Sequence, residues 1–254
     1  KKDKNIFTVS FYMLIDAHAH IDVKDFDNDR EEVLKKCNIV VVNAGVDLES
    51  NLKSLELEKK YDNVIAAIGF HPEFIKDKIS EVDKCLELTK KARVISEIGL
   101  DYFWVKEEEL RKKQKEVLSK FLEIAEKDRK PTLIHVRGGF SDLISLLSSY
   151  KVKFAIHGFE GSIKNANKVI DLDGLISIPP ILVRDKNRQE VVKNIDIEYL
   201  LTETDSPFMG PEKMKRNEPC NVKLTIEKIA ELKGIEKKEV EEKILNNFTL
   251  FSGV

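Results

Sequence analysis

The feature of this chain that most constrains its fold is a regular alternation of short apolar segments with longer amphipathic ones. The amphipathic segments have helical spacing, and the longest, Glu107 to Arg129, ends just before Pro131. Eight short segments are rich in Ile, Val or Leu, as buried strands are: residues 14–18, 39–45, 64–69, 94–99, 132–136, 154–158, 175–179 and 199–204. This alternation predicts a (β/α)8 TIM barrel of the α/β class, with a doubly wound open sheet as the main alternative.

The length of the chain, 254 residues, suits one barrel domain, which we expect to span residues 13–254. Residues 1–12 are then an upstream extension that feeds the first strand, and Met13 is a possible natural start. The opening "KKDK" and "IFTVSFYMLI" also resemble a signal peptide, but cleavage at Ala17 or Ala19 would damage the motif that follows. No run of 18 uncharged apolar residues occurs, so we expect no transmembrane helix and no membrane partner.

Charge and cysteine content narrow the function further. Lys and Arg number 43 against 45 Asp and Glu, so the net charge of −2 offers no global basic field, and any contact with nucleic acid must be local. The three cysteines, Cys37, Cys85 and Cys220, are scattered and form no C-x-x-C pair. We therefore expect reduced thiols in an intracellular, cytoplasmic protein.

The first apolar segment carries polar residues in an unusual arrangement. In "LIDAHAHID", Asp16, His18 and His20 share one face of a strand, because strand side chains alternate between faces. Buried polar groups need partners, and a divalent metal is one good partner because neutral imidazole is a strong ligand. Taken alone, His-x-His is a weak signal for a metal, and two ordinary surface or core histidines are the more common explanation.

Other segments end in the same kind of residue. Glu97 lies near the end of the fourth, His135 and His157 end the fifth and sixth, Asp205 follows the eighth, and His71 follows the third. Active sites of (β/α)8 barrels gather at the carboxyl ends of the strands. We therefore expect these side chains to converge with those of the first segment, with Glu97 within ~10 Å of His18.

Seven motifs occur along residues 14 to about 222: "DAHAHID", "GFHP", "EIGLDY", "LIHVR", "HGFEGS", "TETDSPF" and "RNEP". In order and spacing the chain resembles the TatD family of metal-dependent deoxyribonucleases, which is amidohydrolase-like. The resemblance implies a barrel with two divalent metal ions per chain, Mg²⁺ or Mn²⁺ with Zn²⁺ also possible. It also implies hydrolysis of phosphodiester bonds in DNA through a metal-activated water, exonucleolytic on single strands.

The resemblance also assigns residues. His18 and His20 hold one metal, and Asp205 completes its set of ligands. Glu97 bridges to a second metal, which His135 and His157 also hold. Asp205 is in addition a candidate base for the bound water, and DNA is the implied partner, with no obligate protein partner evident.

Several neighbouring residues have two readings. His71 either meets a phosphate oxygen or the leaving group, or simply caps a turn before Pro72. Glu203 either orients a metal ligand or is a buried structural partner. Arg137 is a plausible phosphate contact. The aromatic run 102–104 either stacks on bases or packs.

Three departures from the family pattern bear on substrate preference. Trp104 stands where the family often has a basic residue, Glu160 stands where it usually has Ser, and "CNV" (220–222) replaces a small-aromatic-aliphatic pattern. The alternative functions are a small-molecule metallohydrolase on the same barrel, acting on an amide, lactone or phosphate ester, and a metal-binding scaffold without catalysis.

Overall fold

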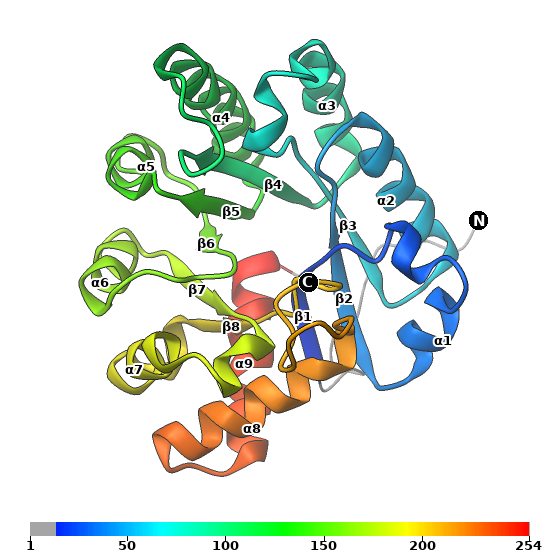
Figure 1. The fold of residues 1–254 in the computed structure, drawn as a ribbon, viewed down its shortest axis with the longest axis vertical. Helices are drawn as coiled ribbons and strands as arrows, with labels where there is room; N and C mark the ends of the chain where they lie inside the picture. Colours follow the sequence, from blue (N-terminus) through cyan, green and yellow to red (C-terminus); the bar gives the residue numbers. More distant parts are fainter. Residues whose placement is uncertain (1–13, 254) are drawn as a thin grey trace.

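A computed structural model describes residues 14–253, in which eight parallel strands alternate with helices around a central axis (Figure 1). The predicted TIM barrel is confirmed. The predicted extension 1–12 and the possible start at Met13 lie outside the described residues. The strands are β1 (Leu14–Ala19), β2 (Ile39–Ala44), β3 (Val64–Ile68), β4 (Val94–Asp101), β5 (Thr132–Arg137), β6 (Phe154–Ile156), β7 (Leu175–Ile178) and β8 (Leu200–Thr202).

The barrel closes where the segment after β8 meets β1. The backbone N–H of Asp205 donates to the carbonyl of His18 at 2.8 Å, and the N–H of His20 donates to the carbonyl of Ser206 at 2.8 Å. The side chain of Thr202 adds a hydrogen bond to the carbonyl of Ile15 at 2.7 Å. These bonds exclude the open-sheet alternative, and they join two histidines and an aspartate of the expected site at the seam.

The helices surround the barrel and match the predicted amphipathic segments. They are α1 (Arg30–Lys35), α2 (Leu48–Lys60), α3 (Val82–Leu88), α4 (Glu108–Asp128), α5 (Phe140–Leu147), α6 (Ile163–Ile170), α7 (Lys186–Asn194), α8 (Val222–Lys233) and α9 (Lys237–Ser252). Short 3₁₀ turns join them: η2 (Lys24–Phe26), η3 (Pro72–Ile75), η4 (Ile79–Glu81), η5 (Thr89–Lys91), η6 (Pro180–Val183), η7 (Ile197–Tyr199) and η8 (Pro219–Asn221).

Local sequence explains where several helices begin and end. Asp47 starts α2 by accepting the N–H of Ser50 at 2.9 Å, which satisfies a donor that the helix leaves free. Arg129 ends α4 in the left-handed conformation, two residues before Pro131. Gly234 ends α8 in the same conformation, which glycine adopts without steric cost.

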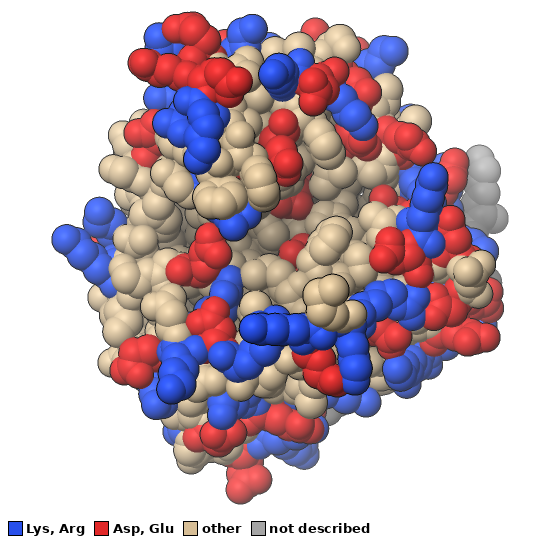
Figure 2. Space-filling view, viewed as in Figure 1, with Lys and Arg blue, Asp and Glu red and all other residues tan. Residues whose placement is uncertain are grey.

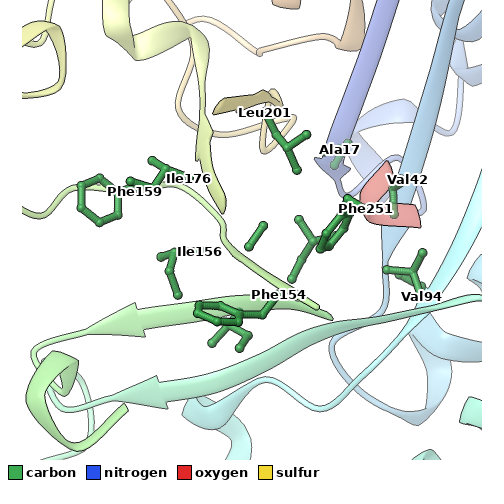
Figure 3. Close-up of a cluster of buried hydrophobic side chains, with 14 of the residues drawn as sticks. Ala17, Val42, Val94, Phe154, Ile156, Phe159, Ile176, Leu201 and Phe251 are labelled. Carbon is green, nitrogen blue, oxygen red and sulfur yellow. The ribbon is translucent and has the colours of Figure 1, made fainter. Parts of the chain in front are cut away.

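Apolar side chains fill the space between strands and helices. Figure 3 shows part of this buried cluster, with Phe154 and Ile156 of β6, Ile176 of β7, Leu201 of β8 and Phe251 of α9. Each of these side chains is at most 4% exposed. Close packing of this kind makes the strands a rigid frame, so the side chains at their carboxyl ends are held in fixed positions. None of the helices among residues 14–253 is long and apolar enough to cross a membrane.

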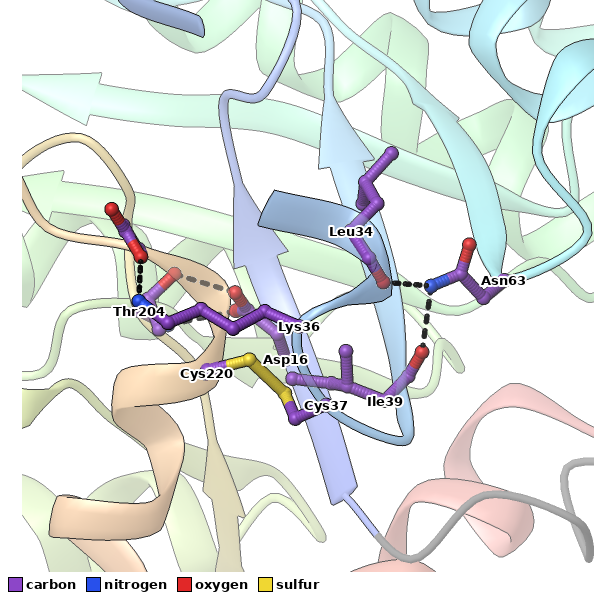
Figure 4. Close-up of a disulfide and its surroundings, with 9 residues drawn as sticks. Asp16, Leu34, Lys36, Cys37, Ile39, Asn63, Thr204 and Cys220 are labelled. Carbon is purple, nitrogen blue, oxygen red and sulfur yellow. Dashed lines mark hydrogen bonds and ion pairs between the residues drawn. A yellow bond between two sulfur atoms is a disulfide. The ribbon is translucent and has the colours of Figure 1, made fainter. Parts of the chain in front are cut away.

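A disulfide corrects one sequence prediction. Cys37, just after α1, is bonded to Cys220 in η8, with the Cα atoms 6.0 Å apart (Figure 4). The expectation of three reduced thiols was therefore wrong for these two residues. Barrel closure brings the segment after β8 beside α1, and a sequence separation of 183 residues gives no sign of that proximity. Cys85 is free, and burial raises the pKa of its thiol to about 11.

Candidate metal centre

A pocket of about 530 Å³ opens at the carboxyl ends of the strands. Figure 2 shows the hollow, with acidic side chains inside it and lysines and arginines gathered along one rim. All five histidines of the chain lie in it or directly beneath it, together with two carboxylates: His18, His20, His71, His135, His157, Glu97 and Asp205. The structure thus brings together every predicted metal ligand. Asp16 of the first segment does not join them, because its Oδ1 accepts the backbone N–H of Thr204 at 2.7 Å.

Four of these residues form a first cluster beside the barrel seam. The Nε2 atoms of His18 and His20 are 3.3 Å apart. Oε2 of Glu97 lies 3.4 Å from Nε2 of His18 and 3.3 Å from Nε2 of His20. Oδ1 of Asp205 lies 3.5 and 3.3 Å from the same two nitrogens. His18, His20 and Asp205 therefore form one group of possible metal ligands, with an oxygen of Glu97 beside both imidazole nitrogens.

The spacing of the first cluster fits a metal ion. A tetrahedral ion with bonds of ~2.0–2.1 Å places its ligand atoms roughly 3.3–3.4 Å apart. An octahedral Mg²⁺ with bonds of similar length places neighbouring ligands only about 2.9–3.0 Å apart. The separations of 3.3–3.5 Å between the two imidazole nitrogens and each carboxylate oxygen are closer to the tetrahedral value than to the octahedral one.

Hydrogen bonds on the far side of each imidazole fix which nitrogen faces the cluster. Nδ1 of His20 lies 3.0 Å from the carbonyl of Ala44, to which it donates, and this leaves Nε2 free as a ligand. Nδ1 of His18 lies 3.3 Å from Oγ of Ser96. Both rings are therefore oriented before any ion binds.

A second cluster surrounds the other oxygen of Glu97. Its Oε1 lies 2.9 Å from Nε2 of His157, 3.1 Å from Nδ1 of His135 and 3.2 Å from Nε2 of His71. Glu97 lies in an irregular stretch of β4, where the register with β5 shifts between Ile95 and Ile98. The two oxygens of Glu97 therefore face different clusters.

Two further carboxylates hold the histidines of the second cluster. Oδ2 of Asp101 lies 2.9 Å from Nε2 of His135. Glu203 is fully buried; its Oε1 lies 3.5 Å from Nδ1 of His157 and accepts the N–H of Gly158 at 2.5 Å. Sequence reasoning missed Asp101 as a site residue. The available signal was its place four residues after Glu97, on the same face of an extended strand.

His71 both caps a turn and faces the second cluster. Its Nδ1 accepts the N–H of Glu73 at 3.2 Å, so the ring caps the turn η3. Its Nε2 points to Glu97 in the second cluster. The capping bond therefore orients the ring towards the pocket.

The charges of the metal-free site are strongly coupled. Burial favours neutral imidazole, yet Asp205 and Glu97 raise the pKa of His20 well above its ordinary value. Glu97 and Glu203 do the same to the pKa of His157, again against burial. Burial would raise the pKa of Glu97, but His157 and the neighbouring histidines hold it well below its usual range. Glu97 thus stays ionised, and in the absence of metal His20 and His157 bind protons, whereas burial and the nearby His157 lower the pKa of His18.

The rim of the pocket holds the predicted phosphate contact and a family departure. Arg137 lines the pocket, and within residues 14–253 it makes no ion pair. Glu160 also lines it, with its carboxylate 3.9 Å from the guanidinium of Arg188. Cys220, of the divergent "CNV" segment, is a disulfide partner.

An eight-stranded parallel barrel with clustered histidines and carboxylates at its strand ends defines a protein of the metal-dependent hydrolase class. Comparison with known families makes the assignment specific. The model of the TatD-related DNase family matches residues 15–252, so the chain belongs to that family.

Individual relatives agree with this assignment. An uncharacterized metal-dependent hydrolase of Methanocaldococcus jannaschii is 38% identical over 244 residues, which are 93% of this chain and 96% of the relative. The human deoxyribonuclease TATDN3 is 30% identical over 253 residues, 92% of each chain. The crystal structure of a TatD homolog from Escherichia coli matches with a TM-score of 0.87 at 23% identity, covering 96% of this chain and 99% of that one. The last comparison supports the fold alone.

Proposed function

We propose that this chain is a divalent-metal-dependent deoxyribonuclease that hydrolyses phosphodiester bonds in single-stranded DNA from an end. The observation that carries the proposal is the position of Glu97, whose two oxygens face two separate ligand clusters. The human relative at 30% identity is named a deoxyribonuclease, which supports DNA as the substrate class. We also propose that residues 13–254 form one domain.

The donor sets suggest how two ions are shared. His18, His20 and Asp205 would hold the first ion, His135 and His157 would hold the second, and Glu97 would contribute one oxygen to each. Such ions would supply Lewis acidity and lower the pKa of a bound water.

Asp205 is the proposed base that accepts the proton of the attacking water. Burial would raise the pKa of this carboxyl, but His20, His157 and His18 hold it below its ordinary value, so it is ionised at neutral pH. Its backbone N–H bond to His18 fixes its position. A general base of this kind contributes ~10²–10⁴ in rate.

The remaining residues position the substrate and the ligands. Nε2 of His71 faces the pocket and is proposed to contact a phosphate oxygen or the leaving group. Arg137 is proposed to hold a phosphate through its guanidinium, which suits a bidentate contact. Glu203 is proposed to orient His157 from behind.

A second function has its own support. A pocket of about 530 Å³ is large enough to enclose a small molecule. The carboxylate of Glu160 at its rim disfavours a polyanion. A small-molecule metallohydrolase acting on an amide, lactone or phosphate ester is therefore the alternative.

Competing substrates decide between these functions. The chain is stripped of metal by chelation, and Mg²⁺, Mn²⁺ or Zn²⁺ is restored in parallel. End-labelled single-stranded DNA is compared with a phosphate monoester, an amide and a lactone. Progressive shortening of the DNA, lost in Asp205→Asn, supports the nuclease. Turnover of a small substrate with intact DNA would instead establish the alternative.

The predicted cytoplasmic location stays a prediction. The Cys37–Cys220 disulfide weighs against it, because such bonds are rare in the cytosol outside hyperthermophiles.

A further inference from the structure

The loop after β4 exposes two large aromatic side chains. Phe103 is 45% exposed and Trp104 is 59% exposed, and their ring centroids lie 4.9 Å apart in an edge-to-face arrangement. Rings that remain this accessible add little to the core. The packing reading of the aromatic run therefore does not explain these two residues.

The loop backbone is nevertheless held firmly. Oδ1 of Asp101 accepts the N–H of Phe103 at 3.0 Å and that of Trp104 at 2.8 Å. Arg111 donates to the carbonyl of Tyr102 at 2.9 Å, and the hydroxyl of Tyr102 donates to Asp142 at 2.7 Å. Exposed rings on a fixed backbone lose little conformational entropy when they bind a partner.

The exposed rings are continuous with the pocket. The guanidinium of Arg137, which lines the pocket, lies 3.8 Å from the ring centroid of Phe103. The second oxygen of Asp101 holds His135 of the second cluster. One carboxylate thus connects a proposed metal ligand to the backbone that presents Phe103 and Trp104.

The chemistry of this surface identifies its occupant. Trp104 offers an exposed stacking face, while Phe103 meets it edge to face and carries Arg137 over its own ring. The cations of Arg137 and Lys106, the latter 5.1 Å from the Phe103 centroid, attract phosphates. Stacking on aromatics beside cationic groups is how proteins bind unpaired bases, whereas bases within a duplex are covered by their neighbours.

We propose that Phe103, Trp104 and Arg137 form a base-stacking platform, which holds one nucleobase of a single-stranded DNA next to the metal centre. The inference rests on the proposed nuclease function for its substrate class. It assigns to Trp104, a departure from the family pattern, the role of substrate positioning.

Trp104 is the single tryptophan of the chain, so its fluorescence reports on the platform directly. The metal-loaded protein is titrated with a phosphorothioate-linked thymidine octamer, which resists cleavage, and with an abasic octamer of the same charge. We expect saturable quenching by the thymidine octamer and little by the abasic one. A stacking partner of this kind typically changes affinity by about 5- to 100-fold when removed.

Variants give a second readout through the anisotropy of a labelled octamer. Trp104→Ala should weaken binding of the thymidine octamer by about 5- to 100-fold. Trp104→Phe keeps a stacking ring, so it should retain most of the wild-type affinity. Leu250→Ala removes an apolar side chain that is 65% exposed on α9, and it should leave binding unchanged.

Three outcomes would overturn the platform. The first is equal quenching by the two octamers, and the second is unchanged affinity in Trp104→Ala. The third is quenching without DNA that disappears when the protein is diluted, which indicates self-association. The last would mean that a second copy covers the rings. Cleavage assays on natural DNA run separately. Stacking without cleavage would support the platform while rejecting the nuclease, and cleavage without stacking would do the reverse.

Discussion

Asp101 lies 2.9 Å from Nε2 of His135, while Nδ1 of the same ring faces Glu97 at 3.1 Å. An ionised carboxylate can only accept a proton, so it keeps the N–H on Nε2 and leaves Nδ1 free as a ligand. Asp101 therefore selects the tautomer that can bind metal, although it does not itself face the cluster.

Replacing Asp101 with Asn should weaken metal binding about 10- to 100-fold. The amide can donate to Nε2, which then moves the ring proton to Nδ1, the atom that has to bind the ion. Competition with a chromophoric chelator measures the affinity. Asp142→Asn, a carboxylate on α5 that holds Tyr102 instead, is the matched control. Equal affinities in wild type and Asp101→Asn would contradict the tautomer argument.

Arg137→Ala should weaken the binding of single-stranded DNA and reduce its salt dependence. Removing one phosphate contact lowers the slope of log affinity against log salt by about 0.7–1. Lys112→Ala is the control, because Lys112 lies on α4, half-exposed and paired with Glu109. Titrations at several salt concentrations give both slopes. Equal losses in the two variants would remove Arg137 from the site.

Metal affinity should rise with pH near and above neutrality. His20 and His157 have raised pKa values in the metal-free chain because of Glu97 and the other carboxylates, so both bind protons that a metal must displace. The imidazolium–carboxylate pairs stabilise the metal-free fold below the ordinary histidine pKa, and this stabilisation is lost as pH rises through the raised values. Calorimetry in buffers of different ionisation enthalpy counts the released protons. Affinity that does not change between pH 6 and 8 would refute this coupling.

The sequence predicts most of the site because the barrel converts order along the chain into proximity. Glu97, His135 and His157 occur near the ends of consecutive strands, and consecutive strands are neighbours in the barrel. Their convergence therefore needs no knowledge of side-chain geometry. The role of Asp101 could not be predicted in this way. A carboxylate at a strand end can be solvated or can hold a neighbour, and only the position of the His135 ring shows that Asp101 bonds to it.

The disulfide could not be predicted from the spacing of the cysteines. Cys37 and Cys220 belong to opposite ends of the chain, and they meet because the segment after β8 returns to the first helix. Likewise, the sequence alone cannot show whether the aromatic run 102–104 packs against the core or binds a ligand. The exposure of Trp104 decides between them, and it follows from the loop conformation that the structure shows.

Reduction of the Cys37–Cys220 bond should lower the free energy of unfolding by about 2–4 kcal/mol, because the bond restricts a long loop of the unfolded chain. Denaturant unfolding with and without dithiothreitol measures the change. The double variant Cys37→Ser/Cys220→Ser should be equally destabilised and insensitive to the reductant. If the reductant still destabilised this variant, the loss of stability would not come from the Cys37–Cys220 bond.

Asp205→Asn should separate catalysis from folding. Asp205 has a left-handed backbone, with φ at 55°, and Asn tolerates this conformation about as well as Asp. The amide can still offer an oxygen, but it cannot accept a proton from water, so turnover should fall by ~10²–10⁴. The melting temperature of the metal-free chain should change little, because the two side chains have nearly the same shape.

The matched control is Asp173→Asn, the same substitution at an exposed residue that also has a left-handed backbone, with φ at 57°. Turnover of single-stranded DNA under saturating Mn²⁺ and thermal melting are measured on all three proteins. If Asp205 served only to fix the turn after β8, its variant would keep normal turnover and lose about 1 kcal/mol of stability, the usual contribution of a cap. That pattern would remove Asp205 as the base, while the normal turnover would still exclude a metal-binding scaffold without catalysis.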